Sequence, residues 1–209
     1  MTDKRAMNRP VALIPFALLA ALVAAGALWR LGDLRAHDRV ESVPTGEIVT
    51  LGGPFSLTDQ NGIARTEKDY RGKYTLVFFG YTYCPDVCPT ELQSISLALD
   101  KLGAVADAVQ PLFVTVDPER DTPARLAEFV SSFHPKLVGL TGPLADIRKT
   151  AIAYRVFFAK HQVPATNYPV DHTGFIYVVG KDGRFLGYLP PGASPDDIAD
   201  AIRSLLGPE

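Results

Sequence analysis

The stretch TLVFFGYTYCPDVCPTELQSISLALDKL, residues 75–102, decides the fold of this chain. Residues 75–81 are continuously apolar, β-branched or aromatic, which is typical of a strand buried on both faces. Residues 89–102 repeat leucine and isoleucine at helical spacing. The two cysteines of the chain, Cys84 and Cys88, lie in the loop between them. The stretch therefore predicts a buried strand, a cysteine-bearing loop and an amphipathic helix.

The same alternation continues to the end of the chain. An Asn-Gly pair at residues 61–62 predicts an early hairpin turn. The pattern predicts strands at residues 111–116, 137–140, 175–179 and 184–188, and helices at 122–134, 144–156 and after Ser194. Strands alternating with helices, followed by a hairpin and a last helix, imply a mixed sheet with helices on both faces. With a cysteine pair after the first buried strand, we predict a thioredoxin-like α/β fold.

Composition excludes several classes of protein. The 209 residues carry a formal net charge of −2, so the chain lacks the basic character of a nucleic-acid-binding protein. The charged fraction of 21% and the aromatic fraction of 10% are typical of a globular domain with a core. Two cysteines are too few for a disulfide-stapled scaffold, so a close pair indicates redox or metal chemistry.

The N-terminal segment predicts where the domain lies. Residues 10–29 read PVALIPFALLAALVAAGALW without a charge, which is long enough for a helix that crosses a membrane. Lys4, Arg5 and Arg9 precede this run, so we expect the N-terminus to stay in the cytoplasm. A cleaved signal peptide is the alternative, although the apolar core of such peptides is usually shorter.

These features give a predicted domain order. We expect a single-pass protein of the inner membrane whose C-terminal domain faces the periplasm. Its parts are a cytoplasmic N-terminus at residues 1–9, a transmembrane anchor at 10–31, a tether at 32–50 and a thioredoxin-like domain at 51–209.

The cysteine pair has three interpretations. Cys84 and Cys88 follow the carboxyl end of a strand, where open α/β sheets form their ligand sites, and Cys88 adjoins a helix start that favours thiolate. A passive disulfide would close a very short loop and remove little chain entropy. A redox couple usually has two intervening residues, whereas this pair has three. A metal clamp would use thiolates, which select copper(I), zinc or iron–sulfur clusters.

A third ligand has to come from elsewhere in the chain. Four histidines are available, and imidazole is the commonest metal ligand type. His37 lies in the predicted tether, His134 at a helix end and His161 in a polar turn. His172 precedes the strand at residues 175–179, so in a thioredoxin-like fold its loop faces the cysteines. Position makes His172 the candidate, but spacing alone leaves this open.

The assembled motifs resemble the Sco/SenC family of copper proteins that help to assemble cytochrome c oxidase. The resemblance covers residues 54–206. Its matching segments are GYTYCPDVCPT at 80–90, VDPERDTP at 116–123 and VDHT at 170–173, with smaller matches at 59–62 and 154–156. Tyr83 departs from the His or Phe of many relatives, at a position that is not a ligand in the family.

The resemblance implies a ligand set and a role. It implies that Cys84, Cys88 and His172 bind one copper ion, Cu⁺ or Cu²⁺. It further implies a metallochaperone, rather than an enzyme, that delivers copper to the dinuclear copper centre of the oxidase. The expected partners are the copper-bearing subunit of cytochrome c oxidase, a copper donor and a thiol reductant, with the membrane contacted through residues 10–31.

Two other functions remain open from the sequence. A thiol–disulfide oxidoreductase would use Cys84 and Cys88 to keep the oxidase cysteines reduced. A peroxidase would need an activated cysteine and a positioning arginine, for which Arg120 and Arg155 are candidates. Asp86 and Asp171 flank the candidate ligands and either tune them or are solvated loop acids.

Overall fold

The computed structural model describes residues 51–161 and 168–206. The predicted anchor at 10–31 and tether at 32–50 lie outside the described residues. Within the described part of the chain, no helix has both the length and the hydropathy needed to cross a membrane.

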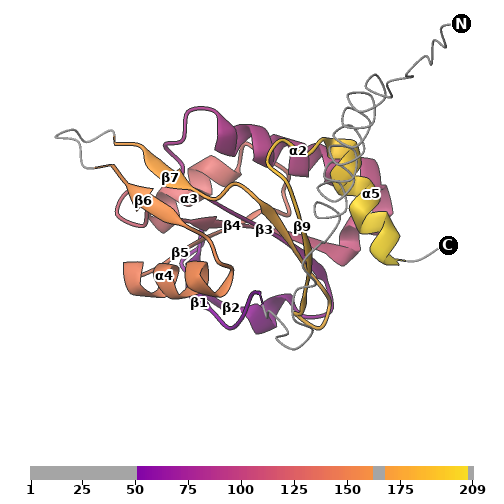
Figure 1. The fold of residues 1–209 in the computed structure, drawn as a ribbon, viewed down its shortest axis with the longest axis horizontal. Helices are drawn as coiled ribbons and strands as arrows, with labels where there is room; N and C mark the ends of the chain where they lie inside the picture. The colour runs from indigo at the N-terminus through magenta and orange to yellow at the C-terminus, as the bar shows by residue number, and fades with distance from the viewer. Residues whose placement is uncertain (1–50, 162–167, 207–209) are drawn as a thin grey trace, which may run out of the picture. The chain divides into compact units, whose positions relative to one another are not determined.

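A seven-stranded mixed sheet forms the centre of the domain (Figure 1). The inner strand β3 pairs parallel with β4 and antiparallel with β8, as expected for a thioredoxin-like fold. The strand order is β2-β1-β5-β4-β3-β8-β9. The strands are β1 (Ser56–Asp59), β2 (Ala64–Thr66), β3 (Tyr74–Gly80), β4 (Val109–Thr115), β5 (Val138–Thr141), β8 (Ile176–Val179) and β9 (Phe185–Leu189).

Helices cover both faces of this sheet, as predicted. Successive residues of a strand point to opposite faces of the sheet. Phe78 of β3 and its register partner Phe113 of β4 therefore point to one face, and Phe79 points to the other. Phe113 packs on Phe129 of α3, with ring centroids 5.4 Å apart. Phe79 packs on Tyr154, the residue that follows α4, also at 5.4 Å. The helices are α2 (Val87–Leu102), α3 (Pro123–Val130), α4 (Leu144–Ala153), α5 (Pro195–Leu206) and the short 3₁₀ helices η1 (Glu67–Tyr70) and η2 (Gly103–Ala108).

A second, two-stranded sheet lies beside α4 and was not predicted. It pairs β6 (Phe158–Lys160) with β7 (Val170–His172) in antiparallel register, and we call these two strands the ribbon (Figure 1). The helix expected at 144–156 ends earlier, at Ala153, because Arg155 adopts a left-handed backbone with φ of 53°. That turn redirects the chain into β6.

Two other helix boundaries differ from the sequence prediction. Helix α2 begins at Val87, so Cys88 lies in its first turn instead of before it. Helix α3 ends at Val130, although the pattern predicted helix up to residue 134. Its start is as expected, because the Thr122 hydroxyl accepts the Arg125 N–H at 3.2 Å and Pro123 occupies the first turn.

Candidate metal centre

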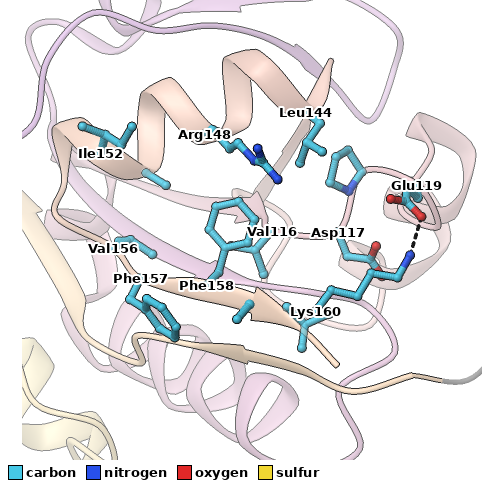
Figure 2. Close-up of a pocket in the computed structure, with 14 residues that line it drawn as sticks. Val116, Asp117, Glu119, Leu144, Arg148, Ile152, Val156, Phe157, Phe158 and Lys160 are labelled. Atoms are coloured by element: carbon cyan, nitrogen blue, oxygen red, sulfur yellow. Dashed lines mark hydrogen bonds and ion pairs between the residues drawn. The ribbon is translucent and has the colours of Figure 1, made fainter. Parts of the chain in front are cut away.

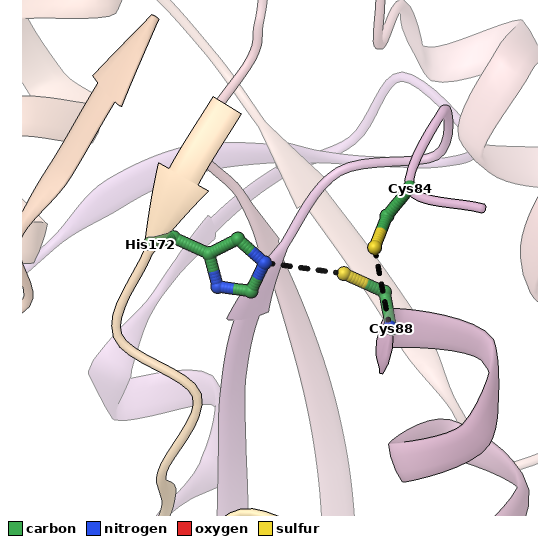
Figure 3. Close-up of side chains that lie close together, drawn as sticks. All are labelled: Cys84, Cys88 and His172. Carbon is green, nitrogen blue, oxygen red and sulfur yellow. Dashed lines mark hydrogen bonds between the residues drawn. The ribbon is translucent and has the colours of Figure 1, made fainter. Parts of the chain in front are cut away.

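Three predicted side chains converge at one edge of the sheet (Figure 3). Cys84 lies in the loop after β3, Cys88 in the first turn of α2, and His172 at the end of β7. Their donor atoms all lie within 4.8 Å of one another, and the Cys88 Sγ is 3.3 Å from the His172 Nε2. The fold therefore brings together two sulfurs and one nitrogen from segments that are far apart in the sequence.

The imidazole ring of His172 turns its Nε2 toward the cysteines and its Nδ1 toward the backbone. Its Nδ1 is 3.2 Å from the carbonyl oxygen of Thr173, so a proton on Nδ1 would be donated there. The ring meets Phe78 and Tyr81 edge to face, at centroid distances of 6.1 and 5.9 Å. Two aromatic walls and one hydrogen bond thus orient the ring so that Nε2 faces the cysteines.

The two sulfurs have different environments. Cys84 is half-buried, and its Sγ accepts the Cys88 backbone N–H at 3.4 Å. The hydrogen bond from the Cys88 thiol lowers the pKa of Cys84 to about 3, with a further contribution from His172. The same hydrogen bond, together with complete burial, raises the pKa of Cys88. The charge of a thiolate is therefore favoured on the half-buried Cys84 and disfavoured on the buried Cys88.

Gly80 gives the buried sulfur its space. A Cβ atom at this position would lie 2.8 Å from the Cys88 Sγ and 2.8 Å from the ring of Phe113. Both distances are shorter than real Cβ contacts, so any side chain here would displace the sulfur. Gly80 lies inside the cysteine motif, but the spacing of that motif gives no indication of this role.

Asp121 fixes the loop that carries Cys84. Its carboxylate accepts the Thr82 N–H at 3.0 Å, the Thr82 hydroxyl at 2.6 Å and the Thr115 hydroxyl at 2.6 Å. The side chain is fully buried, and this burial raises the pKa of Asp121. The sequence indicated turn chemistry for residues 117–121, whereas the structure ties Asp121 to the start of the cysteine loop.

Arg120 bridges the cysteine loop and the ribbon. Its guanidinium stacks 3.6 Å from the ring centroid of Tyr168, which precedes β7, and 4.7 Å from that of Tyr83, which precedes Cys84. It also pairs with Asp117 and donates to the Tyr168 carbonyl at 2.9 Å. The Tyr168 hydroxyl donates to Asp117 at 2.8 Å. These contacts explain Arg120 as part of a structural network that joins the two segments.

The other candidate residues lie apart from the three sulfur and nitrogen donors. His134 sits in a turn, where its Nδ1 accepts the Lys136 N–H at 3.1 Å. His161 pairs with Asp171 at 2.7 Å on the surface, so Asp171 faces His161 in place of His172. Asp86 occupies the N-cap of α2 without a capping side-chain bond. His37 lies outside the described residues.

The donor set fits a thiophilic metal ion. Thiolates select copper(I) or zinc, and imidazole is shared by copper and zinc sites, so two sulfurs and one nitrogen suit either metal. Three donors leave a further coordination position open, and Cys84 remains accessible from outside. This arrangement suits a metal that is exchanged between proteins better than a closed structural site.

Comparison with known proteins identifies the family. The SCO1/SenC family model matches residues 44–207. The human mitochondrial SCO1 homolog is 42% identical over 161 residues, which cover 76% of this chain and 54% of that protein. The SCO2-like protein of Rickettsia conorii is 33% identical over 192 residues, which cover 90% of this chain and 94% of that protein. This chain therefore spans about half the length of the human relative and nearly all of the bacterial one.

A solved structure supports the same family. Bradyrhizobium japonicum ScoI with copper bound superposes with a TM-score of 0.69 at 48% sequence identity, covering 74% of this chain and 98% of that one. The sequence motifs, the fold and both comparisons agree, so the predicted resemblance is confirmed. The chain belongs to the SCO1/SenC family.

Proposed function

We propose that this protein binds one copper ion through Cys84, Cys88 and His172 and takes part in the assembly of cytochrome c oxidase. The observation that carries the proposal is the convergence of two sulfurs and one imidazole nitrogen within 4.8 Å. The copper-bound ScoI of Bradyrhizobium japonicum, 48% identical, supports copper as the metal. The family resemblance supports the dinuclear copper centre of the oxidase as the destination.

Copper transfer would proceed by stepwise ligand exchange. The half-buried Cys84 is the ligand that an incoming partner thiolate reaches first, and the fully buried Cys88 would be released last. A copper donor loads the site after a thiol reductant has opened any Cys84–Cys88 disulfide. Because the sulfurs and the imidazole must be deprotonated to bind, copper affinity falls as the pH is lowered.

The proposal includes a location. Residues 10–31 would anchor the protein in the inner membrane as a single span, and residues 32–50 would tether the domain at 51–209 in the periplasm. The uncharged run at 10–29 and the three cationic residues before it support this arrangement.

Metal analysis of the reduced protein tests the proposal. We expect one copper ion per chain in the wild type and strongly reduced copper(II) retention in His172→Ala. Glu128→Gln, on an exposed carboxylate of α3, is the matched control and should retain copper fully. Absence of copper from the reduced wild-type protein would refute the proposed ligand set.

A thiol–disulfide reductase is the second candidate, and the low pKa of Cys84 favours it. The Cys84 thiolate would attack a partner disulfide, forming a mixed disulfide and releasing one partner thiol. Cys88 would then attack Cys84, releasing the second partner thiol and leaving this chain oxidised until an external thiol reduces it. His172→Ala separates the functions, since it should strongly reduce copper(II) retention and leave disulfide exchange largely intact. Normal oxidase assembly in that variant would favour the reductase.

A further inference from the structure

The surface at the end of α4 combines exposed apolar and cationic side chains. Ile152 is 74% exposed and Phe157 65% exposed, the two largest exposed fractions among the large apolar side chains of the described residues. Arg148, Lys149 and Arg155 surround them at helical spacing or in the turn after the helix. We call these five residues the α4 surface.

The charges of this surface are not neutralised within the domain. In the part of the chain that the structure describes, no hydrogen bond or ion pair involves the charged groups of Arg148, Lys149 or Arg155. By contrast, Lys160 at the far end of the adjoining cleft pairs with Glu119 at 2.6 Å. The α4 surface therefore presents net positive charge beside exposed apolar groups.

A shallow cleft of about 370 Å³ opens on the same side. Figure 2 shows Leu144 and Arg148 projecting from α4 on one wall and Phe158 on the other. Leu144 is 36% exposed and extends the apolar part of the surface along the helix. Ile152 and Phe157 also line this cleft, so the exposed apolar side chains of α4 and of the segment after it share one opening.

The chain enters the domain beside this surface. Gly52, near the first described residue, donates its N–H to the carbonyl oxygen of Ala153 at 2.8 Å, at the C-terminal end of α4. The proposed tether at residues 32–50 joins the domain just before that point. Even fully extended, a chain of this length would reach at most roughly 65 Å. The tether would therefore keep the α4 surface close to the membrane and raise its effective concentration there.

We propose that the α4 surface docks on the bilayer interface, with Ile152 and Phe157 entering the headgroup region and the three cations contacting anionic lipid headgroups. Exposed apolar side chains flanked by arginine and lysine are the features that interfacial elements use. Phe157 is joined to Thr173, the residue after His172, by backbone and hydroxyl hydrogen bonds of 3.0 Å. Docking would therefore hold the ribbon, and with it the metal centre, in a fixed orientation to the membrane. This inference rests on the proposed membrane anchor.

The test uses the full chain in nanodiscs with phosphatidylcholine alone or in equal parts with phosphatidylglycerol. The native Trp29 is replaced by phenylalanine, and a single reporter is introduced as Phe157→Trp. Tyr188→Trp is the matched control. Tyr188 is 58% exposed and lies on β9, the edge strand at the other end of the sheet from β1 and β2. We expect blue-shifted emission and quenching by brominated acyl chains at position 157 with phosphatidylglycerol, and neither effect at position 188. Neutralising Arg148 and Lys149 as glutamine should weaken docking roughly fivefold per cation.

The outcomes separate this inference from the proposed function. Absence of quenching at position 157, or equal quenching at both positions, would overturn the docking surface, and an acidic protein partner would then be the better occupant. Co-elution of protein with nanodiscs tests the anchor independently, and copper content of the same samples tests the metal site. If the chain does not co-elute, the two reporters are measured with added vesicles of the same lipids, where the same difference between positions is expected.

Discussion

At the scale of single residues, the space left by Gly80 controls the position of the Cys88 sulfur. We predict that Gly80→Ala lowers the free energy of unfolding by about 1–3 kcal/mol, because its Cβ would overlap the sulfur and the Phe113 ring. Copper affinity should fall as well, since the displaced sulfur no longer faces His172. Gly187→Ala is the control, because no atom lies within 4 Å of its Cβ. Urea denaturation and copper titration of both variants check this, and equal behaviour of the two would contradict it.

The buried carboxyl of Glu91 should make the free energy of unfolding depend on pH. This carboxyl is buried, one oxygen accepts the Gly192 N–H, and Oε2 has no partner among the described residues. Burial raises the pKa of Glu91, so the folded chain keeps this proton to a higher pH than the unfolded chain does. The free energy of unfolding therefore falls as the pH rises above the unfolded value of about 4.3.

The substitution Glu91→Gln should remove this fall in the free energy of unfolding with rising pH. We expect the variant to be more stable than the wild type at pH 7 by on the order of 1 kcal/mol, and equal to it below about pH 4. Glu128→Gln, at an exposed site, should change stability by less than about 0.5 kcal/mol at either pH. Thermal unfolding at both pH values measures the difference. A variant that is less stable than the wild type at pH 7 would contradict the prediction.

Residues of the site differ in how far the sequence indicates them. Cys84 and Cys88 follow from spacing, loop position and helix start. His172 lies 84 residues from Cys88 in the chain, so its proximity depends on tertiary structure, and the family resemblance selected it. Gly80 and Asp121 could not be found from spacing, because their roles are a missing side-chain volume and a buried hydrogen-bond acceptor.

At the scale of elements, the ribbon is held to the body through Tyr168. Its hydroxyl donates to Asp117 at 2.8 Å, and its ring stacks on Arg120. We predict that Tyr168→Phe costs about 1 kcal/mol of stability and reduces copper(II) affinity, while binding of copper(I) by the two cysteines changes less. Tyr188→Phe on β9 is the control for loss of an exposed hydroxyl. Parallel titrations with both oxidation states check this, and equal losses for the two would argue against a role specific to His172.

The elements that sequence predicted are those with long, unambiguous periodicity. The buried strands β3 and β4 and the helix α2 have continuous apolar or helical patterns, so they were predicted close to their observed bounds. The ribbon strands β6 and β7 have three residues each, too few to express a period of two. The shortened α4 depends on the left-handed Arg155, whose conformation no residue preference indicates. Short elements fixed by tertiary contacts are therefore the ones that were missed.

At the scale of the whole molecule, the metal centre joins three separate parts of the fold: the loop after β3, the helix α2 and the ribbon. A metal ion that binds the folded state alone stabilises it in proportion to the logarithm of its free concentration. We predict that copper(I) at about a hundredfold excess over its dissociation constant raises the free energy of unfolding of the reduced protein by about 2.7 kcal/mol.

Addition of a copper chelator should reverse this gain in the free energy of unfolding. Cys84→Ser should reduce the gain strongly, His172→Ala should reduce it partly, and Glu128→Gln should leave it unchanged. Thermal unfolding under a reducing atmosphere measures each shift. A shift that persists in Cys84→Ser would mean that copper binds elsewhere, whereas a full shift in His172→Ala would limit the copper(I) site to the two sulfurs and reserve the imidazole for copper(II).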